Sequence, residues 1–313
     1  MLLSRVADNL YWAARYLERA EDTARVLREH TNLLVDLPTS VPVTWEPLLA
    51  VTGSKVQFEA TFERADEHAI VRWLVAERAN AGSILMSVEN ARENLRTTRE
   101  VLPREVWQAV NDLYLHVASH NAEGVSRRSR GRFCERVIGE CQRIAGILDG
   151  TMSRDEAADM WRLGCSIERA DMTTRVIDVR CGSIIESRSA VVDTYDDVQW
   201  MSVLRSLSAL QMYHRSTRRA VAGPSTLRFL LRDEQFPRSI ACCLREVGLA
   251  ISQLPPQQVA YEALAAARNE LQRVPVDDLD VTGLHDAMDR LQISIGSLHD
   301  AVAASFFMAI GPG

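Results

Sequence analysis

The sequence predicts an all-α protein, a helical bundle built from two tandem helical halves. Three observations support this prediction: apolar residues recur at helical spacing along most of the chain, the alternation typical of strands is nearly absent, and a charged signature occurs twice. The one weak strand candidate lies near residues 189–194. We expect the two halves to pack around a pseudo-two-fold axis, as the subunits of a homodimer would.

The first copy of the charged signature occupies residues 18–25 and the second occupies residues 168–175, so the two copies lie 150 positions apart. Two further blocks recur in the same order, at offsets of 155 and 156: Trp45-x-x-Leu48-Leu49 with Trp200-x-x-Val203-Leu204, and Val71-Arg72-Trp73-Leu74 then Ser83-Ile84 with Leu227-Arg228-Phe229-Leu230 then Ser239-Ile240. The repeat predicts a first half over residues 1–150 and a second over residues 151–313, packed into one compact unit.

The helices can be placed in order along the chain. The first is the clearest, because apolar residues from Leu3 to Leu27 follow an unbroken three-four spacing and Ser4 suits the N-cap position. Further amphipathic runs predict helices at 44–53, 66–78, 82–101, 103–119, 131–149, 154–180, 195–219, 225–232, 238–254, 258–272 and 284–308. Proline and glycine clusters mark the breaks between these runs.

The charged residues of each signature lie on a stripe beside the apolar seam of their helix. In the first copy these are Glu18, Glu21 and Arg25; in the second they are Glu168, Asp171 and Arg175. The second acid of each copy precedes an arginine by four residues, which is the favourable order for a helical ion pair. Small residues on the seam predict that the two signature helices approach closely and bring both stripes near the axis: Ala20, Ala24 and Ala170.

Two interpretations of this cluster compete. In the first, it is a partly buried ion-pair network that sets how the two halves align, since such networks are costly and contribute specificity more than stability. In the second, its carboxylates and arginines form a site that binds a charged ligand or performs acid/base chemistry. Exposure distinguishes them: a stripe packed away from any pocket indicates a scaffold, and a concave, solvent-connected cluster indicates a site.

Composition narrows the function. The chain has a formal net charge of −6 over 313 residues, whereas nucleic-acid-binding domains are usually basic. Its 47% of hydrophobic residues is ample for a buried core. Neither a secretory signal nor a membrane-spanning stretch is visible, and the six cysteines contain no C-x-x-C pair. We therefore expect a cytoplasmic protein that binds neither nucleic acid nor membranes.

Other chemistry is not indicated. The chain contains no phosphate-binding glycine motif, no nucleophile elbow and no Glu-x-x-His pair of the kind that di-iron bundles need, so we expect no cofactor and no metal. Asp112, His116 and His120 share one helix face that could offer three metal ligands, but a solvated face is the simpler interpretation. The basic run Arg127–Arg132 is interpreted as a solvated loop, with docking to an acidic partner as the alternative.

The first block carries a family resemblance. The run Ser4-Arg5-Val6-Ala7-Asp8-Asn9-Leu10-Tyr11-Trp12, followed by Arg15-Tyr16-Leu17-Glu18-Arg19-Ala20-Glu21, resembles the signature of the bacterial alpha-E family, an all-helical family named for its Glu-Arg motif. Later blocks are similar to the family as well: Ser83-Ile84, Ala91-Arg92-Glu93-Asn94 and Phe236-Pro237-Arg238-Ser239-Ile240. The second copy departs from the pattern at residues 160–166, so equal roles for the two copies are not expected.

The resemblance implies a set of residues and a set of partners. The residues are Glu18, Arg19, Glu21, Arg25, Arg92, Glu93 and Asn94, with Glu168, Arg169, Asp171 and Arg175 in the second copy. Members of the family are commonly encoded beside ATP-grasp-type ligases and transglutaminase-like proteins. We therefore expect an accessory protein of a peptide or protein modification system that binds a partner enzyme or its peptide substrate. The alternative is an enzyme of unknown reaction that uses the Glu/Arg cluster.

Overall fold

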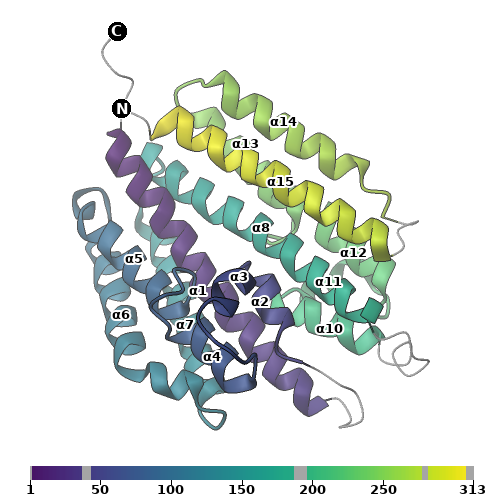
Figure 1. The fold of residues 1–313 in the computed structure, drawn as a ribbon. Coiled ribbons are helices and arrows are strands. Elements are labelled where there is room, and N and C mark those ends of the chain that lie inside the picture. The colour runs from purple at the N-terminus through teal and green to yellow at the C-terminus, as the bar shows by residue number, and fades with distance from the viewer. Residues whose placement is uncertain (1, 37–43, 187–195, 277–280, 308–313) are drawn as a thin grey trace.

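A computed structural model describes residues 2–36, 44–186, 196–276 and 281–307 (Figure 1). Within these ranges the chain is helical and contains no strand, which confirms the all-α prediction. The weak strand candidate at 189–194 lies outside the described residues. No helix in the described part of the chain combines the length and the apolar character that crossing a bilayer demands.

The two signature helices form the centre of the bundle. They are α1 (Ser4–Asp36) and α8 (Glu156–Glu186), which pack along one another in the same direction (Figure 1). They approach closely at Gly164, where an added Cβ would clash with the Tyr11 carbonyl oxygen and lie 2.9 Å from the Cβ of Ala14. The expected packing of the two helices is therefore confirmed, and this close contact lies more than a turn before the predicted Ala170.

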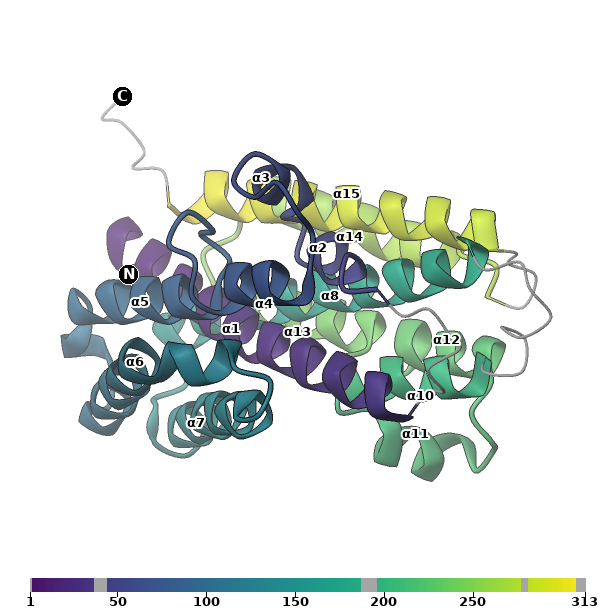
Figure 2. The same cartoon turned by 60° about the horizontal axis from the view of Figure 1, so that its bottom comes forward.

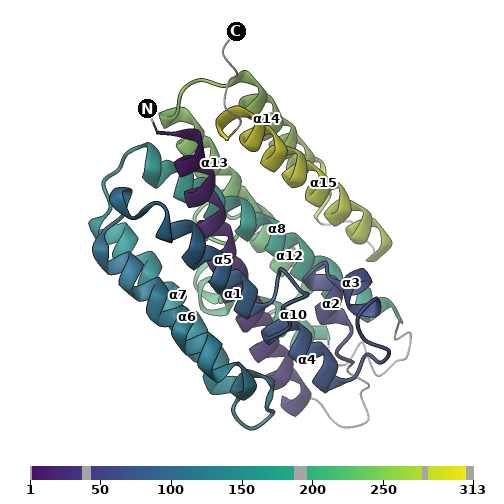
Figure 3. The same ribbon diagram turned by 60° about the vertical axis from the view of Figure 1, so that its left-hand side comes forward.

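Each central helix carries its own set of long helices (Figure 2). Helices α5 (Ile84–Arg96) and α7 (Arg130–Thr151) pack on α1, and α6 (Arg104–Val125) packs on both of them. Beside α8, the helices α13 (Ile240–Gln253) and α15 (Val281–Phe306) take the same relation, with α14 (Gln258–Arg273) packed on both. Figure 3 shows the two sets on opposite sides of the central pair.

Short helices follow each central helix in the chain. After α1 come α2 (Pro47–Val51), α3 (Lys55–Glu59) and α4 (Glu67–Val75); after α8 come α10 (Asp196–Ser206), α11 (Leu210–Thr217) and α12 (Gly223–Arg232). The contacts cross over, because α2 packs against α8 while α10 packs against α1. One short helix of each half therefore contacts the central helix of the other half, and α10 contacts α8 as well.

Several predicted boundaries differ from the structure. The helix expected at 195–219 is divided, because Ser208 has a φ of 51° that a right-handed helix cannot contain. Helix α5 ends at Arg96 and a 3₁₀ turn follows at Arg99–Val101, while the short α3 was not predicted. Helix α1 begins at Ser4 itself, so Leu3 holds the cap position and its carbonyl accepts the first backbone bonds.

Candidate functional site

The Glu-Arg pairs of the two signatures bind one another reciprocally across the α1/α8 contact. Arg169 on α8 donates to the Glu18 carboxylate on α1. In return, Arg19 on α1 donates from Nε to Glu168 Oε1 at 2.6 Å and from Nη2 to Oε2 at 3.1 Å. Glu18 and Glu168, which have no partner within their own signature, thus each obtain the arginine of the opposite copy.

Around Glu18 the cluster is closed by a second arginine; we call Glu18, Glu21, Asp22, Arg169 and Arg238 the sealed side. Arg238, in the loop before α13, donates to Asp22 Oδ1 at 2.5 Å and to Glu18 Oε2 at 3.2 Å. Its guanidinium also lies 3.6 Å from Glu21. Three carboxylates and Arg238 are thereby buried together, each with under a tenth of its surface exposed.

The sealed side moves two carboxyl pKa values in opposite directions. Burial alone would raise the pKa of Glu18, but the Arg169 and Arg238 guanidiniums outweigh this effect and bring that pKa below its usual range. Burial raises the pKa of Asp22 to about 7 despite Arg238, and the Glu18 and Glu21 carboxylates add to this rise. Asp22 Oδ2 is buried without a hydrogen-bond partner in the described structure.

Around Glu168 the second arginine comes from α1 itself; we call Glu168, Arg15, Arg19, Asp171 and Arg175 the open side. Arg15 donates from Nε to Glu168 Oε2 at 2.6 Å. Against the upward effect of burial, the Arg19 and Arg15 guanidiniums lower the pKa of Glu168 to about 2. Arg175 completes the stripe by donating from Nε to Asp171 Oδ2 at 3.0 Å.

A pocket of about 320 Å³ opens on this side of the cluster. Charged groups of the open side line it together with the turns after α2 and before α5: Arg19, Thr23, Val51, Thr52, Gly53, Ser54, Gln57, Ala79, Asn80, Ala81, Gly82, Glu168, Asp171, Met172 and Arg175. The Arg19 and Arg175 side chains are 26% and 30% exposed, while Glu168 is 2% exposed. The signature stripe is therefore divided between a buried network and the wall of a concave site.

The last arginine of each signature meets a residue with positive φ in the other half. Arg25 donates to the Ser208 hydroxyl and to Glu21. Arg175 lies against Gly53, whose φ is 62° and where an added Cβ would lie 2.8 Å from Arg175 Nη1. Glycine at this turn therefore supplies both the left-handed backbone and the space for the guanidinium.

A chain of polar contacts connects Glu168 with α15. Tyr11 and His299 form a 2.7 Å hydrogen bond through the phenolic oxygen and Nδ1, and their rings stack. Arg15, which binds Glu168, donates from Nη1 to the same Tyr11 oxygen at 3.4 Å. Burial, together with the Arg15 charge, lowers the pKa of His299 to about 4. The imidazole is thus neutral at physiological pH and acts as a packing partner.

The three candidates on α5 lie apart from the pocket. Arg92 donates to Asn111 Oδ1 at 2.8 Å and lies over the ring of Tyr114 on α6. Glu93 forms an exposed ion pair with Arg96 on its own helix. The Asn94 carbonyl accepts hydroxyl hydrogen bonds at the end of the helix. Their partners indicate roles in the α5/α6 contact and in ending α5.

The basic run differs from the expected solvated loop, because it is a loop only as far as Ser129 and the next residue is buried. Arg130 is the first residue of α7 and is 1% exposed. Its guanidinium donates to Glu67 Oε1 at 3.0 Å and lies over the ring of Trp45. On the face considered for metal binding, the rings of His116 and His120 stack on each other, while Asp112 faces Arg143 at 3.9 Å.

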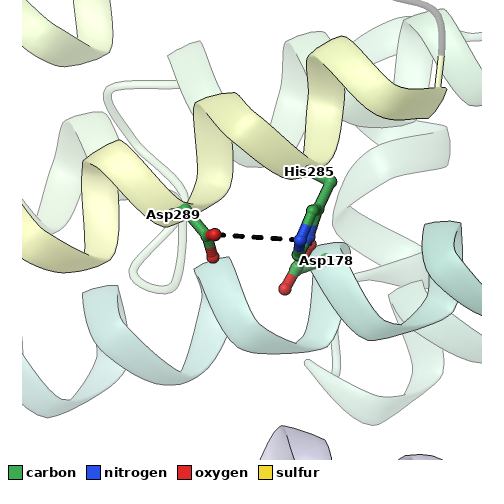
Figure 4. A group of neighbouring side chains, drawn as sticks. All are labelled: Asp178, His285 and Asp289. Carbon is green, nitrogen blue, oxygen red and sulfur yellow. Dashed lines mark hydrogen bonds and ion pairs between the residues drawn. The ribbon is translucent and has the colours of Figure 1, made fainter.

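A different group could hold a cation. Asp178 on α8 and His285 and Asp289 on α15 place three ligand atoms within 4.8 Å of one another (Figure 4). His285 Nδ1 donates to Asp178 at 2.6 Å, and Nε2 lies 3.7 Å from Asp289. The hydrogen bond to the Asp178 carboxylate raises the pKa of His285. Sequence reasoning missed this group; the four-residue spacing of His285 and Asp289 was its only local signal.

A second cavity of about 380 Å³ lies where α7, α8 and α13 meet, and Arg169, Cys165 and Arg162 are among its lining residues. Arg162 is paired with Asp159 at 2.9 Å. Burial places the pKa of the Cys165 thiol far above its usual range, so this cysteine is a poor nucleophile.

Comparison with known proteins gives one family and three long relatives. The model of the Alpha-E family, described as a predicted alpha-helical domain with a conserved ER motif, matches residues 2–307. Uncharacterised proteins of Mycobacterium bovis and of two Mycobacterium tuberculosis strains are 23% identical over 336 residues. These matches cover 96% of this chain but span only 36% of each relative's length. No solved structure matches the chain.

Proposed function

The chain belongs to the Alpha-E family, and from the geometry of its charged cluster we propose that it is a binding subunit without chemistry of its own. It acts in a cytoplasmic system that modifies peptides or proteins. Its partner there is an ATP-grasp-type ligase, with transglutaminase-like proteins as further members. The chain contributes a charged pocket that holds the substrate, and the partner supplies ATP-dependent activation.

The observation that carries this proposal is the character of the pocket wall. The pocket is concave and charged, yet its lining contains neither histidine nor cysteine. Its buried carboxylate, Glu168, is held ionised by two arginines with a pKa of about 2, so it is a poor general base at neutral pH. The Thr52 and Ser54 hydroxyls bond to each other instead of to a base. Such a wall can recognise a charged group but lacks an activated nucleophile.

We propose further that the two halves, residues 1–150 and 151–313, descend from one duplicated helical unit. The reciprocal Glu-Arg bonds, the crossed packing of α2 and α10 and the matched positions of Gly53 and Ser208 support this origin. Because the second copy of the unit evolved beside the first, one side of the axis could close while the other kept a pocket.

Two further observations support a partner and a cytoplasmic location. Each relative is far longer than the region matched here, so in those proteins the helical unit is joined to additional chain. Five cysteines are free thiols in the structure, as is usual in a reducing compartment: Cys134, Cys141, Cys165, Cys242 and Cys243.

Co-purification with the ATP-grasp-type protein of the same genome tests the proposal, followed by ATP-turnover assays with and without this chain. We expect stable association, and stimulation of turnover that falls at least fivefold in Arg175→Met. The matched control is Arg162→Met, which is 32% exposed on the same helix and also paired with an aspartate. Absence of both association and stimulation would refute the partner role.

The alternative hypothesis, an enzyme that uses the Glu/Arg cluster, has one observation in its favour. Asp171 and Arg175 line a pocket that opens to solvent, and Asp171 is 20% exposed. Turnover of a peptide substrate by the purified chain alone would favour the enzyme over the binding subunit.

A further inference from the structure

The pocket lies at a position where the two halves carry different residues. The repeat that aligns Ser83 with Ser239 also aligns Gly82 with Arg238. On the sealed side, Arg238 extends into the carboxylate cluster and bonds to Glu18. Gly82 has no side chain to do the same, and it lines the pocket. The open side therefore keeps a space where the sealed side has a guanidinium.

The four charged residues that line this space, two arginines and two acids, sum to zero, but a fifth charge, on Arg15, lies against Glu168 behind the wall. Glu168 and Asp171 supply two carboxylates, while Arg15, Arg19 and Arg175 supply three guanidiniums. Arg15, buried behind Glu168, and Arg19, at the pocket wall, share that one carboxylate, so together they carry one positive charge more than it balances. One excess positive charge favours a ligand group with a single negative charge.

The pocket wall also offers both donors and an acceptor. Arg19 uses two of its five N–H groups on Glu168, and Arg175 uses Nε on Asp171 while Nη1 lies beside Gly53. Asp171 uses one carboxylate oxygen, Oδ2, on Arg175. A ligand could therefore receive N–H bonds from the two arginines and donate one to Asp171.

We infer that this pocket binds the α-carboxylate of an amino-acid residue, either a free amino acid or the C-terminal residue of a peptide. Arg19 and Arg175 bind the carboxylate, and Asp171 accepts from the nitrogen on the adjacent carbon. A phosphate group carries more negative charge and no N–H donor, so Glu168 and Asp171 disfavour it. A volume of about 320 Å³ suits one or two residues.

This inference rests on the proposed binding role and names its ligand class. Equilibrium dialysis of the full chain with mass-spectrometric detection tests it directly. The probes are a mixture of the twenty common L-amino acids, a randomised tripeptide mixture with free C-termini, and the same mixture amidated at the C-terminus. We expect retention of species from one of the first two mixtures, and at least tenfold weaker binding after amidation.

The two free-carboxylate mixtures distinguish the source of the ligand. Retention of an amino acid identifies a free metabolite, and retention of tripeptides alone identifies a peptide C-terminus. Retention of neither, equal retention of the amidated peptides, or displacement of the retained species by equimolar sodium phosphate would overturn the inference.

Variants locate the binding. Arg175→Met should weaken retention at least tenfold, and Gly82→Arg should abolish it by filling the pocket. Arg162→Met, at the second cavity, should retain full binding, and circular dichroism establishes that each variant is folded. Unchanged binding in Arg175→Met and Gly82→Arg would place the ligand elsewhere and refute the assignment.

The dialysis uses the purified chain without a partner, so its result is independent of the co-purification. Loss of ligand binding with intact partner association would remove the ligand class and leave the proposed function standing. Ligand binding without any partner association would refute the proposed partner role and leave the ligand class standing.

Discussion

The sealed side and the open side contain the same signature, and each neutralises a buried glutamate with two arginines, but the second arginine has a different origin on each side. Each buries a motif glutamate between two helices, and each gives that glutamate the arginine of the opposite motif. The second arginine differs: Arg238 reaches Glu18 from a loop, whereas Arg15 reaches Glu168 from α1. Because Arg15 approaches along the helix, the loop position opposite Glu168 can be glycine. The comparison teaches that a pocket remains where the second guanidinium comes from the helix, as Arg15 does, and that it is filled where the guanidinium comes from the loop, as Arg238 does.

The largest expected effect tests the sealed side. Arg238→Ala removes the cation that bonds to Glu18 and Asp22, both 5% or less exposed, and leaves their carboxylates buried without it. We expect the free energy of unfolding to fall by about 3 to 5 kcal/mol in urea titrations. At the aligned open-side position, Gly82→Ala should cost under about 1 kcal/mol. Equal costs at both positions would contradict the division into two sides.

The second effect concerns pH. The unfolded chain releases the Asp22 proton near its ordinary pKa of 3.8, whereas the folded chain holds it to about pH 7. Between these values the folded state binds more protons, so stability should fall as the pH rises, by about 4 kcal/mol in total. Urea midpoints of Asp22→Asn and of the unaltered protein, compared from pH 4 to pH 8, check this. The variant should lack the fall.

Glu168 predicts the opposite sign on the open side. Its folded-state pKa of about 2 lies below the ordinary value of 4.5, so its contribution is complete above the ordinary value and is lost as the pH falls toward 2. A Glu168→Gln variant should therefore lose less stability on acidification than the unaltered protein. Indistinguishable acid titrations of the two proteins would argue against a glutamate held ionised by Arg15 and Arg19.

A smaller effect tests the contact that both sides share. Gly164→Ala places a Cβ against the Tyr11 carbonyl and Ala14, so α1 and α8 must move apart. Thermal and urea unfolding should show a loss of about 1 to 3 kcal/mol. Gly146→Ala on α7 is the control, because nothing lies within 4 Å of the added Cβ. It should instead stabilise by about 0.5 to 1 kcal/mol.

The smallest effect should be nearly the same in both halves. Ser83 caps α5 by accepting from the Met86 backbone N–H at 3.2 Å, and Ser239 caps α13 by accepting from Cys242 at 3.2 Å. Alanine at either position should cost about 1 kcal/mol of unfolding free energy. A large difference between the two variants would show that the two halves differ in their framework as well as in their charges.

The sequence by itself determined the helical framework and the ion pairs that form within a single helix. The three-four spacing places α1, and the repeat at residue 168 indicates a second helix of the same kind, because helical periodicity is a local property of the chain. The i,i+4 pair of Asp171 with Arg175 was predictable for the same reason. The helix positions and this ion pair both depend only on residues that are close together in the sequence.

Only the tertiary structure decided which parts of the signature are buried and which line a pocket. Arg238 lies 220 positions from Glu18 in the chain, and no local pattern links them. Arg15 and Glu168 meet because two helices cross closely at Gly164, and Gly82 matters because its missing side chain leaves room beside them. A bond between distant residues depends on how helices pack, and packing is a property of the whole fold.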